Sequence, residues 1–159
     1  MQRNTLYILI LCLFAAIGLI WLLQQTPASR EPLALPLGQL QRGNIKQVEV
    51  ADSHGTIATL RLNNGLWDET VSGYPADNLK IERLLDLLFS LKVLETKTSR
   101  ADLYNRLGVE RIDQPAARGI QLRIGDASSA SYTMTFGDLT SNGQYMRPND
   151  ESTTLLIAP

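Results

Sequence analysis

The stretch LNNGLWDETVSGYPAD, from Leu62 to Asp77, marks the point where a sheet pattern gives way to a helix pattern. Asparagine and glycine tolerate positive φ, so the NNG run that ends at Gly65 predicts a tight hairpin turn. The strand after this turn contains Trp67, one of 2 tryptophans in the chain. Pro75 then precedes Asp77, a residue suited to cap a helix N-terminus. We therefore expect turn, strand, loop and helix cap in this order.

The residues after Asp77 repeat apolar side chains at helical spacing. The pattern predicts an amphipathic helix from Asp77 to about Val93. Its apolar positions are Leu79, Ile81, Leu84, Leu85, Leu88 and Leu91. Leu87 and Phe89 widen this apolar face, so we expect the helix to pack deeply against a sheet.

The first 25 residues indicate a membrane anchor. Residues 6–23 carry no charge, and as a helix they would extend ~27 Å, about one hydrocarbon core. A cleaved signal peptide is the alternative, but this apolar run is longer than the apolar region typical of signal peptides. Arg3 lies before the run and no basic residue follows closely, which predicts a cytoplasmic N-terminus and an exported remainder. The lipid bilayer is thus an expected partner of residues 6–23.

Three parts of the chain follow from this interpretation. Residues 1–25 are the cytoplasmic tip and anchor, residues 26–43 a proline-containing linker, and residues 44–159 one exported domain. The apolar LALPL run inside the linker leaves a second option, in which it packs on the domain.

Strand patterns flank the predicted helix. Three strands precede it, at 45–50, 56–62 and 66–71, and we expect them to form one antiparallel meander. A short helix at 101–107, capped by Ser99 and ended by Gly108, follows the main helix. Four more strands, at 119–126, 131–137, 143–148 and 153–159, predict a second meander. The expected fold class is α+β, with an N-terminal transmembrane helix, an antiparallel β-meander, two helices and a second antiparallel β-meander in one domain.

Composition excludes several partners. The chain has 15 Lys+Arg against 16 Asp+Glu, so it has no basic field to attract nucleic acid. His54 is the only histidine and lies in a predicted turn, and the exported part has no cysteine, so we predict no metal site. The glycines lie at strand ends with no helix after them, which does not suit a phosphate-binding loop. We therefore predict no cofactor.

Two groups in the opening stretch are candidate sites. Trp67 suits either an exposed stacking platform or a core side chain beneath the helix, and burial statistics favour the core. Asp68, Glu69 and Asp77 are candidate catalytic carboxylates. However, Asp68 and Glu69 are adjacent in a strand and point to opposite faces, while Asp77 has a capping role. We therefore predict no catalytic residue.

Tyr145 and Arg147 are the candidate partner-binding residues. They alternate along a predicted strand and share one face, so they would form a solvent-facing patch of the residue types enriched at interfaces. The alternative is that Tyr145 packs on the sheet edge while Arg147 pairs with an acid.

The order of these motifs resembles the domain-of-unknown-function 4340 family of bacterial envelope proteins. The structural family markers are Gly65, Trp67, Pro75, Asp77 and Gly108, followed by Tyr145 and Arg147 in the late strand. The resemblance implies a membrane-anchored envelope protein, in some members associated with ABC-type transport systems of gliding motility. It implies no catalytic residue set.

The sequence thus favours a single-pass protein of the bacterial inner membrane with a periplasmic C-terminal domain. We expect this domain to act as a binding or scaffolding module for a membrane or periplasmic protein partner, as an accessory of an envelope transport complex. One alternative is an envelope hydrolase that acts on peptidoglycan or peptides. Another is a cleaved, soluble periplasmic binding protein.

Overall fold

A computed structural model describes residues 33–35, 37, 40–126, 130–148 and 151–159. They belong to one compact unit, which runs from Pro32 to Pro159. The expected anchor, residues 6–23, lies outside the described residues. Within the described residues, every helix is too short or too polar to span a membrane.

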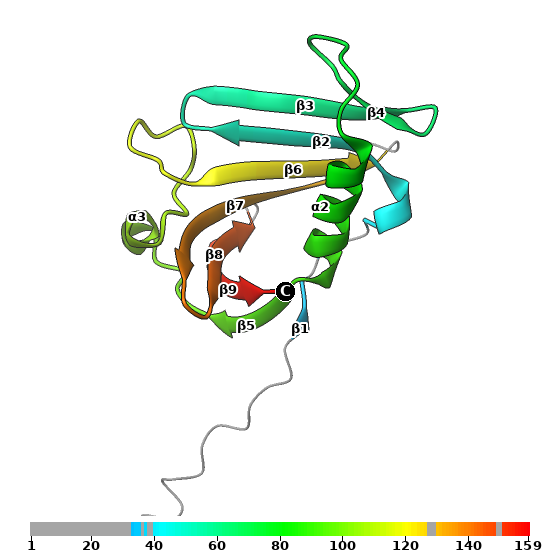
Figure 1. The fold of residues 1–159 in the computed structure, drawn as a ribbon. Coiled ribbons are helices and arrows are strands. Elements are labelled where there is room, and N and C mark those ends of the chain that lie inside the picture. The colour runs from blue at the N-terminus through cyan, green and yellow to red at the C-terminus, as the bar shows by residue number, and fades with distance from the viewer. Residues whose placement is uncertain (1–32, 36, 38–39, 127–129, 149–150) are drawn as a thin grey trace, which may run out of the picture. The chain divides into compact units, whose positions relative to one another are not determined.

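The described residues form nine strands that join in one antiparallel sheet. The strands are β1 (Leu33–Ala34), β2 (Ile45–Asp52), β3 (Gly55–Asn63), β4 (Leu66–Glu69), β5 (Lys92–Thr96), β6 (Ile120–Asp126), β7 (Ser131–Thr140), β8 (Gly143–Pro148) and β9 (Leu155–Ala158). Their order across the sheet is β1-β5-β9-β8-β7-β6-β2-β3-β4. Figure 1 shows that the sheet curls, with β2 and β3 on one arm and β9 and β5 on the other.

This sheet corrects the expected fold class. The two meanders are not separate, because β2 pairs with β6 as well as with β3. Val48 of β2 lies opposite Ile124 of β6, and neither side chain is exposed. Strand β5 was not expected in either meander, yet it pairs with β9 and with β1. The arrangement is one continuous antiparallel sheet with few helices, and the predicted α+β class with two meanders is wrong.

Four short helical segments complete the described fold. They are η1 (Arg42–Asn44), α2 (Asn78–Ser90), η2 (Ala101–Leu103) and α3 (Tyr104–Leu107). Gly108 ends α3 with a φ of 67°, as the sequence predicts, but Ser99 does not cap this region. The main helix ends at Ser90 rather than near Val93, because β5 begins at Lys92.

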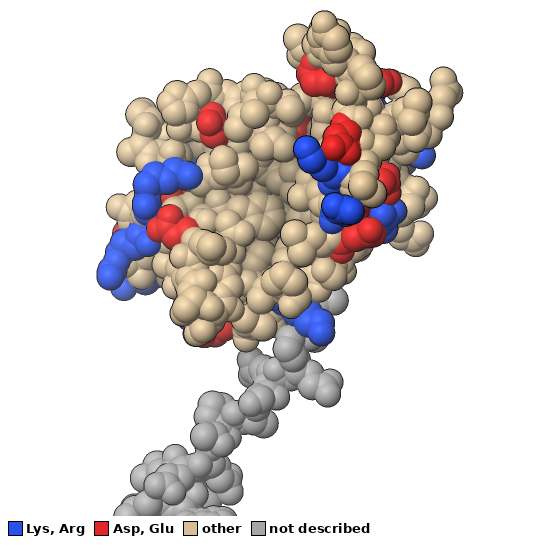
Figure 2. Space-filling view, viewed as in Figure 1, with Lys and Arg blue, Asp and Glu red and all other residues tan. Residues whose placement is uncertain are grey.

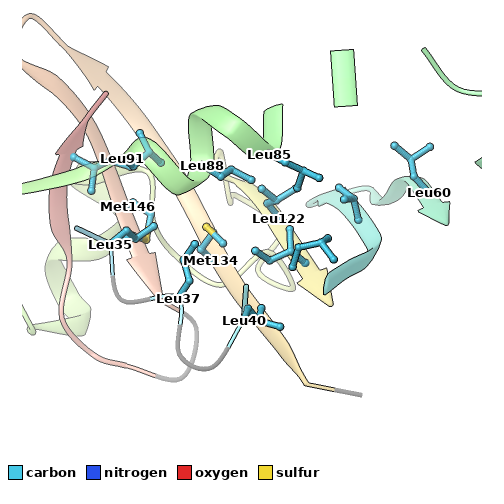
Figure 3. Packing of buried hydrophobic residues seen from close by; sticks show 14 of the residues in the cluster. Leu35, Leu37, Leu40, Leu60, Leu85, Leu88, Leu91, Leu122, Met134 and Met146 are labelled. Atoms are coloured by element: carbon cyan, nitrogen blue, oxygen red, sulfur yellow. The ribbon is translucent and has the colours of Figure 1, made fainter. Parts of the chain in front are cut away.

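Helix α2 covers part of one sheet face. Leu85 and Leu88 of α2 are buried in the same apolar cluster as Leu122 and Met134 of the sheet (Figure 3). Burying large apolar side chains from helix and sheet together is the main favourable term in such a domain. The core therefore lies between α2 and the middle strands.

Part of the expected linker belongs to this core. Leu35, Leu37 and Leu40 are all buried and lie in the apolar cluster. The backbone N–H of Leu35 donates to the carbonyl of Leu91, at the end of α2, over 3.1 Å. The option in which the LALPL run packs on the domain therefore holds for its described residues, which are part of the fold.

Asp77 fixes the start of α2. Its carboxylate accepts a hydrogen bond from the backbone N–H of Lys80 over 3.2 Å. Replacing Asp77 by alanine should lower the free energy of unfolding by about 1 kcal/mol, because a backbone donor of the first turn loses its partner. Urea unfolding followed by circular dichroism measures this. Asp77→Asn keeps a capping oxygen and should stay near the parent value; a loss as large as that of Asp77→Ala would argue against capping.

Candidate functional site

Among the described residues, an apolar groove of about 440 Å³ lies beside α2. We call it the α2 groove. Helix α2 contributes Leu84, Leu87 and Leu88, its C-cap contributes Leu91, and the sheet contributes Val50, Ile120, Leu122, Phe136, Leu139 and Ile157. Figure 2 shows a hollow in an uncharged surface, with charged side chains gathered on either side of it. Its volume falls within the range of small-molecule sites.

The groove is a continuation of the core face of the sheet. Side chains two residues apart on a strand share a face. On β6, Ile124 is fully buried, Leu122 is 5% exposed and Ile120 is 42% exposed, so the same apolar face runs outward from the core. On β7, Met134 is fully buried, and Phe136, two residues further along, is only partly buried. The apolar face of the sheet extends beyond the part that α2 covers. The uncovered part of this face forms the groove.

Helix α2 supplies the second wall. Leu84, Leu87 and Leu88 lie three and four residues apart, which is one stripe of a helix, and the C-cap residue Leu91 follows them. Leu88 is 2% exposed and belongs to the core as well, whereas Leu87 is 46% exposed. On the opposite wall, Leu139 of β7 is 78% exposed. Large apolar side chains thus remain open to water on both sides of the groove.

The groove offers little polar chemistry. No Asp, Glu, Lys, Arg or His lines it. Gln144 is its one side chain with an amide, and the Nε2 of that side chain donates to the carbonyl of Gly137 over 3.1 Å. This lining suits apolar contact with a ligand, and its side chains include no acid, base or nucleophile.

Trp67 lies in the core and not in the groove. Its side chain is 1% exposed, and its indole Nε1–H donates to Oε1 of Glu82 on α2 over 3.0 Å. This hydrogen bond, and after it the one from Arg42, holds the pKa of the Glu82 carboxyl below its ordinary value. Arg42 also pairs with Asp86, at 2.5 Å. Trp67 therefore ties β4 to α2, and an exposed stacking platform does not form.

The three candidate carboxylates have separate local partners. Asp77 caps α2, and Asp68 accepts from the Asn63 side chain over 3.4 Å. Glu69 accepts from the backbone and hydroxyl of Ser72, and these bonds lower its pKa, with the hydroxyl bond as the largest cause. Each carboxylate stabilises a turn or a helix end. They do not appear together in any described pocket.

His54 lies in the turn between β2 and β3, where its side chain is 90% exposed. Its backbone N–H donates to Asp52 over 2.8 Å. Within the described ranges, no group of three or more His, Cys, Asp or Glu residues is placed to hold a metal ion.

Arg147 corrects the expected surface patch. It is 5% exposed, so Tyr145 and Arg147 do not form a solvent-facing pair. The Nε of Arg147 donates to the carbonyl of Val109 over 2.9 Å, and its guanidinium carbon lies 4.9 Å from the centre of the Tyr104 ring. Burial is the main cause that lowers the pKa of Arg147. The segment with η2 and α3 covers this face, which no pattern local to β8 could reveal.

Sequence patterns did not identify the α2 groove. The available signals were the extra leucine at position 87 and the apolar residue Ile120, which extends the inward face of β6 by one more position. Both residues were consistent with a longer helix that would bury them. Only the length of α2, which ends at Ser90, leaves this part of the face open.

Comparisons with curated proteins and with solved structures gave no match. The sequence profile of one family, described as a domain of unknown function (DUF4340), matches residues 67–159. The match begins at Trp67 and takes in α2 and strands β5 to β9, which supply most of the groove. It covers more than half of the 159 residues. The chain therefore belongs to the DUF4340 family, as the order of its motifs predicted.

Proposed function

We propose that this protein is a membrane-tethered binding module, and that its domain holds an apolar ligand in the α2 groove. The observation that carries the proposal is the groove itself, about 440 Å³ with leucines on the helix wall and leucine, isoleucine, valine and phenylalanine on the sheet wall. A concave apolar surface that is left exposed to water is typical of an interaction or ligand-binding site. A bound ligand would cover the part of the sheet face that α2 leaves exposed.

The proposed location rests on residues 6–23. Their uncharged run suits a bilayer anchor with the N-terminus in the cytoplasm and the domain in the periplasm. A tether would raise the effective concentration of the domain near other membrane components. An accessory role beside an envelope transport complex is consistent with this arrangement. The local partners of Asp68, Glu69 and Asp77 support binding over hydrolysis.

Photolabelling tests the groove. The full chain in lipid nanodiscs would be exposed to a small uncharged aromatic diazirine, and adducts would be mapped by mass spectrometry. We expect adducts on groove residues of α2 and β7. Leu87→Glu and Leu139→Glu should each lower this labelling by at least about tenfold, because a charge would have to lose water when the probe binds.

Val71 provides the matched control. It is 90% exposed and lies outside the groove, so Val71→Glu should leave groove labelling unchanged. Both groove positions are also partly exposed, which limits the effect of these substitutions on folding. Adducts spread evenly over exposed apolar residues, unchanged by Leu139→Glu, would refute a binding groove.

A further inference from the structure

We propose that the ligand of the α2 groove is the acyl chain of a membrane lipid. This inference rests on the proposed function and names the chemical class of the ligand. Three observations support it: the nonpolar lining, the place where the chain enters the domain, and a cation at that same end.

The lining favours a ligand without polar groups. An extended peptide would bring backbone N–H and C=O groups into the groove, and each would lose water with little to replace it. The side-chain donor of Gln144 is already used by the carbonyl of Gly137. A hydrocarbon chain needs no hydrogen bond and gains from each methylene that it buries. The chemistry of the groove therefore matches an acyl chain better than a peptide strand.

The chain enters the domain at one end of the groove. Strand β1 pairs with β5, with Ala34 opposite Lys92. Leu35 bonds to the carbonyl of Leu91, and Leu91 lines the groove. Residue 33 follows the apolar run 6–23 so closely that the chain between them can extend at most about 35 Å. A tether of this reach keeps the groove close to its proposed source of lipid.

Charge at this end suits a phospholipid. Lys92 directly follows Leu91 and is exposed. Lys92 also lies opposite Ala158, another residue that lines the groove. A lipid whose tail occupies the groove would place its phosphate near this end, where a lysine ammonium attracts it. Other occupants would be a second copy of the domain, the chain's own residues 6–23, or an amphipathic helix of another protein.

The test uses the full chain in nanodiscs of phosphatidylethanolamine and phosphatidylglycerol. One phospholipid carries a diazirine midway along its acyl chain, and a second carries it on the headgroup. We expect tail adducts on groove residues of α2 and β7, lowered at least about tenfold by Leu139→Glu. Leu79→Glu is the matched control, because Leu79 is 60% exposed on α2 but does not line the groove. Headgroup adducts should centre on β5.

Two failures can be told apart. If the small aromatic probe labels the groove while tail adducts are confined to residues 6–23, the lipid inference is overturned and the binding function stands. If neither probe labels the groove, both are overturned. A photoactivatable residue at position 139 that crosslinks to a second copy, or to residues 6–23, would assign the groove to that occupant and reject the lipid.

Discussion

Replacing Trp67 by alanine is expected to lower the free energy of unfolding by about 4 kcal/mol. The side chain is almost fully buried in the core cluster, so its removal leaves a large cavity between β4 and α2. The same change removes the indole donor from Glu82. The two losses fall on the contact that fixes the helix against the edge of the sheet.

Urea unfolding followed by circular dichroism measures the effect of Trp67→Ala. Leu66→Ala is the matched control, because Leu66 precedes Trp67 on β4 and is 58% exposed. It should change stability by no more than about 0.5 kcal/mol. Trp67→Phe keeps most of the ring and should lie between the two. If Trp67→Ala and Leu66→Ala cost the same, Trp67 does not tie β4 to α2.

Replacing Arg147 by alanine is expected to lower the free energy of unfolding by about 3 kcal/mol. A hydrogen bond from a charged donor contributes about 1.5 to 3 kcal/mol, and this one holds the carbonyl of Val109. Contact with the Tyr104 ring would be lost as well. We expect the segment from Tyr104 to Val109 to loosen first, which hydrogen exchange would detect as lost protection.

Arg123 gives a matched comparison for Arg147. It is an exposed arginine on β6, and Arg123→Ala should cost no more than about 0.5 kcal/mol. Arg147→Lys keeps the charge but not the planar group that donates to Val109 and stacks on Tyr104, so it should behave more like Arg147→Ala than like the parent. A near-neutral Arg147→Ala would show that α3 is held by other contacts.

Local features of the fold were predictable because each depends on neighbouring residues. The turn at Gly65 follows from residues that accept positive φ, and Gly65 has a φ of 84°. The Asp77 cap follows from one carboxylate and the helix pattern after it. The positions of most strands follow from alternation over a few residues.

Strand pairing was not predictable in the same way. Val48 and Ile124 belong to different predicted meanders, and nothing in either strand specifies the other as its partner. Strand β5 is largely exposed, so alternation gave it no clear place in a sheet. Pairing between distant strands depends on how the whole core closes, which a local pattern does not encode.

The candidate site was less predictable than the fold. The sequence drew attention to residues with chemical groups, such as Trp67 and Arg147, and the structure buries both. The α2 groove consists of residues that look like ordinary core, such as Leu87 and Ile120. Whether such a residue is covered depends on where a helix ends relative to a sheet face, and not on its own type.

The short pairing of β1 with β5 has a mechanical consequence. A pull on the chain at the N-terminal end of β1 would load two residue pairs, Leu33 with Val93 and Ala34 with Lys92, before it reached the longer strands. The next bond in line joins Leu35 to Leu91, at the end of α2. Tension at this point would therefore separate β1 from β5 first and act directly on the wall of the groove that Leu91 lines.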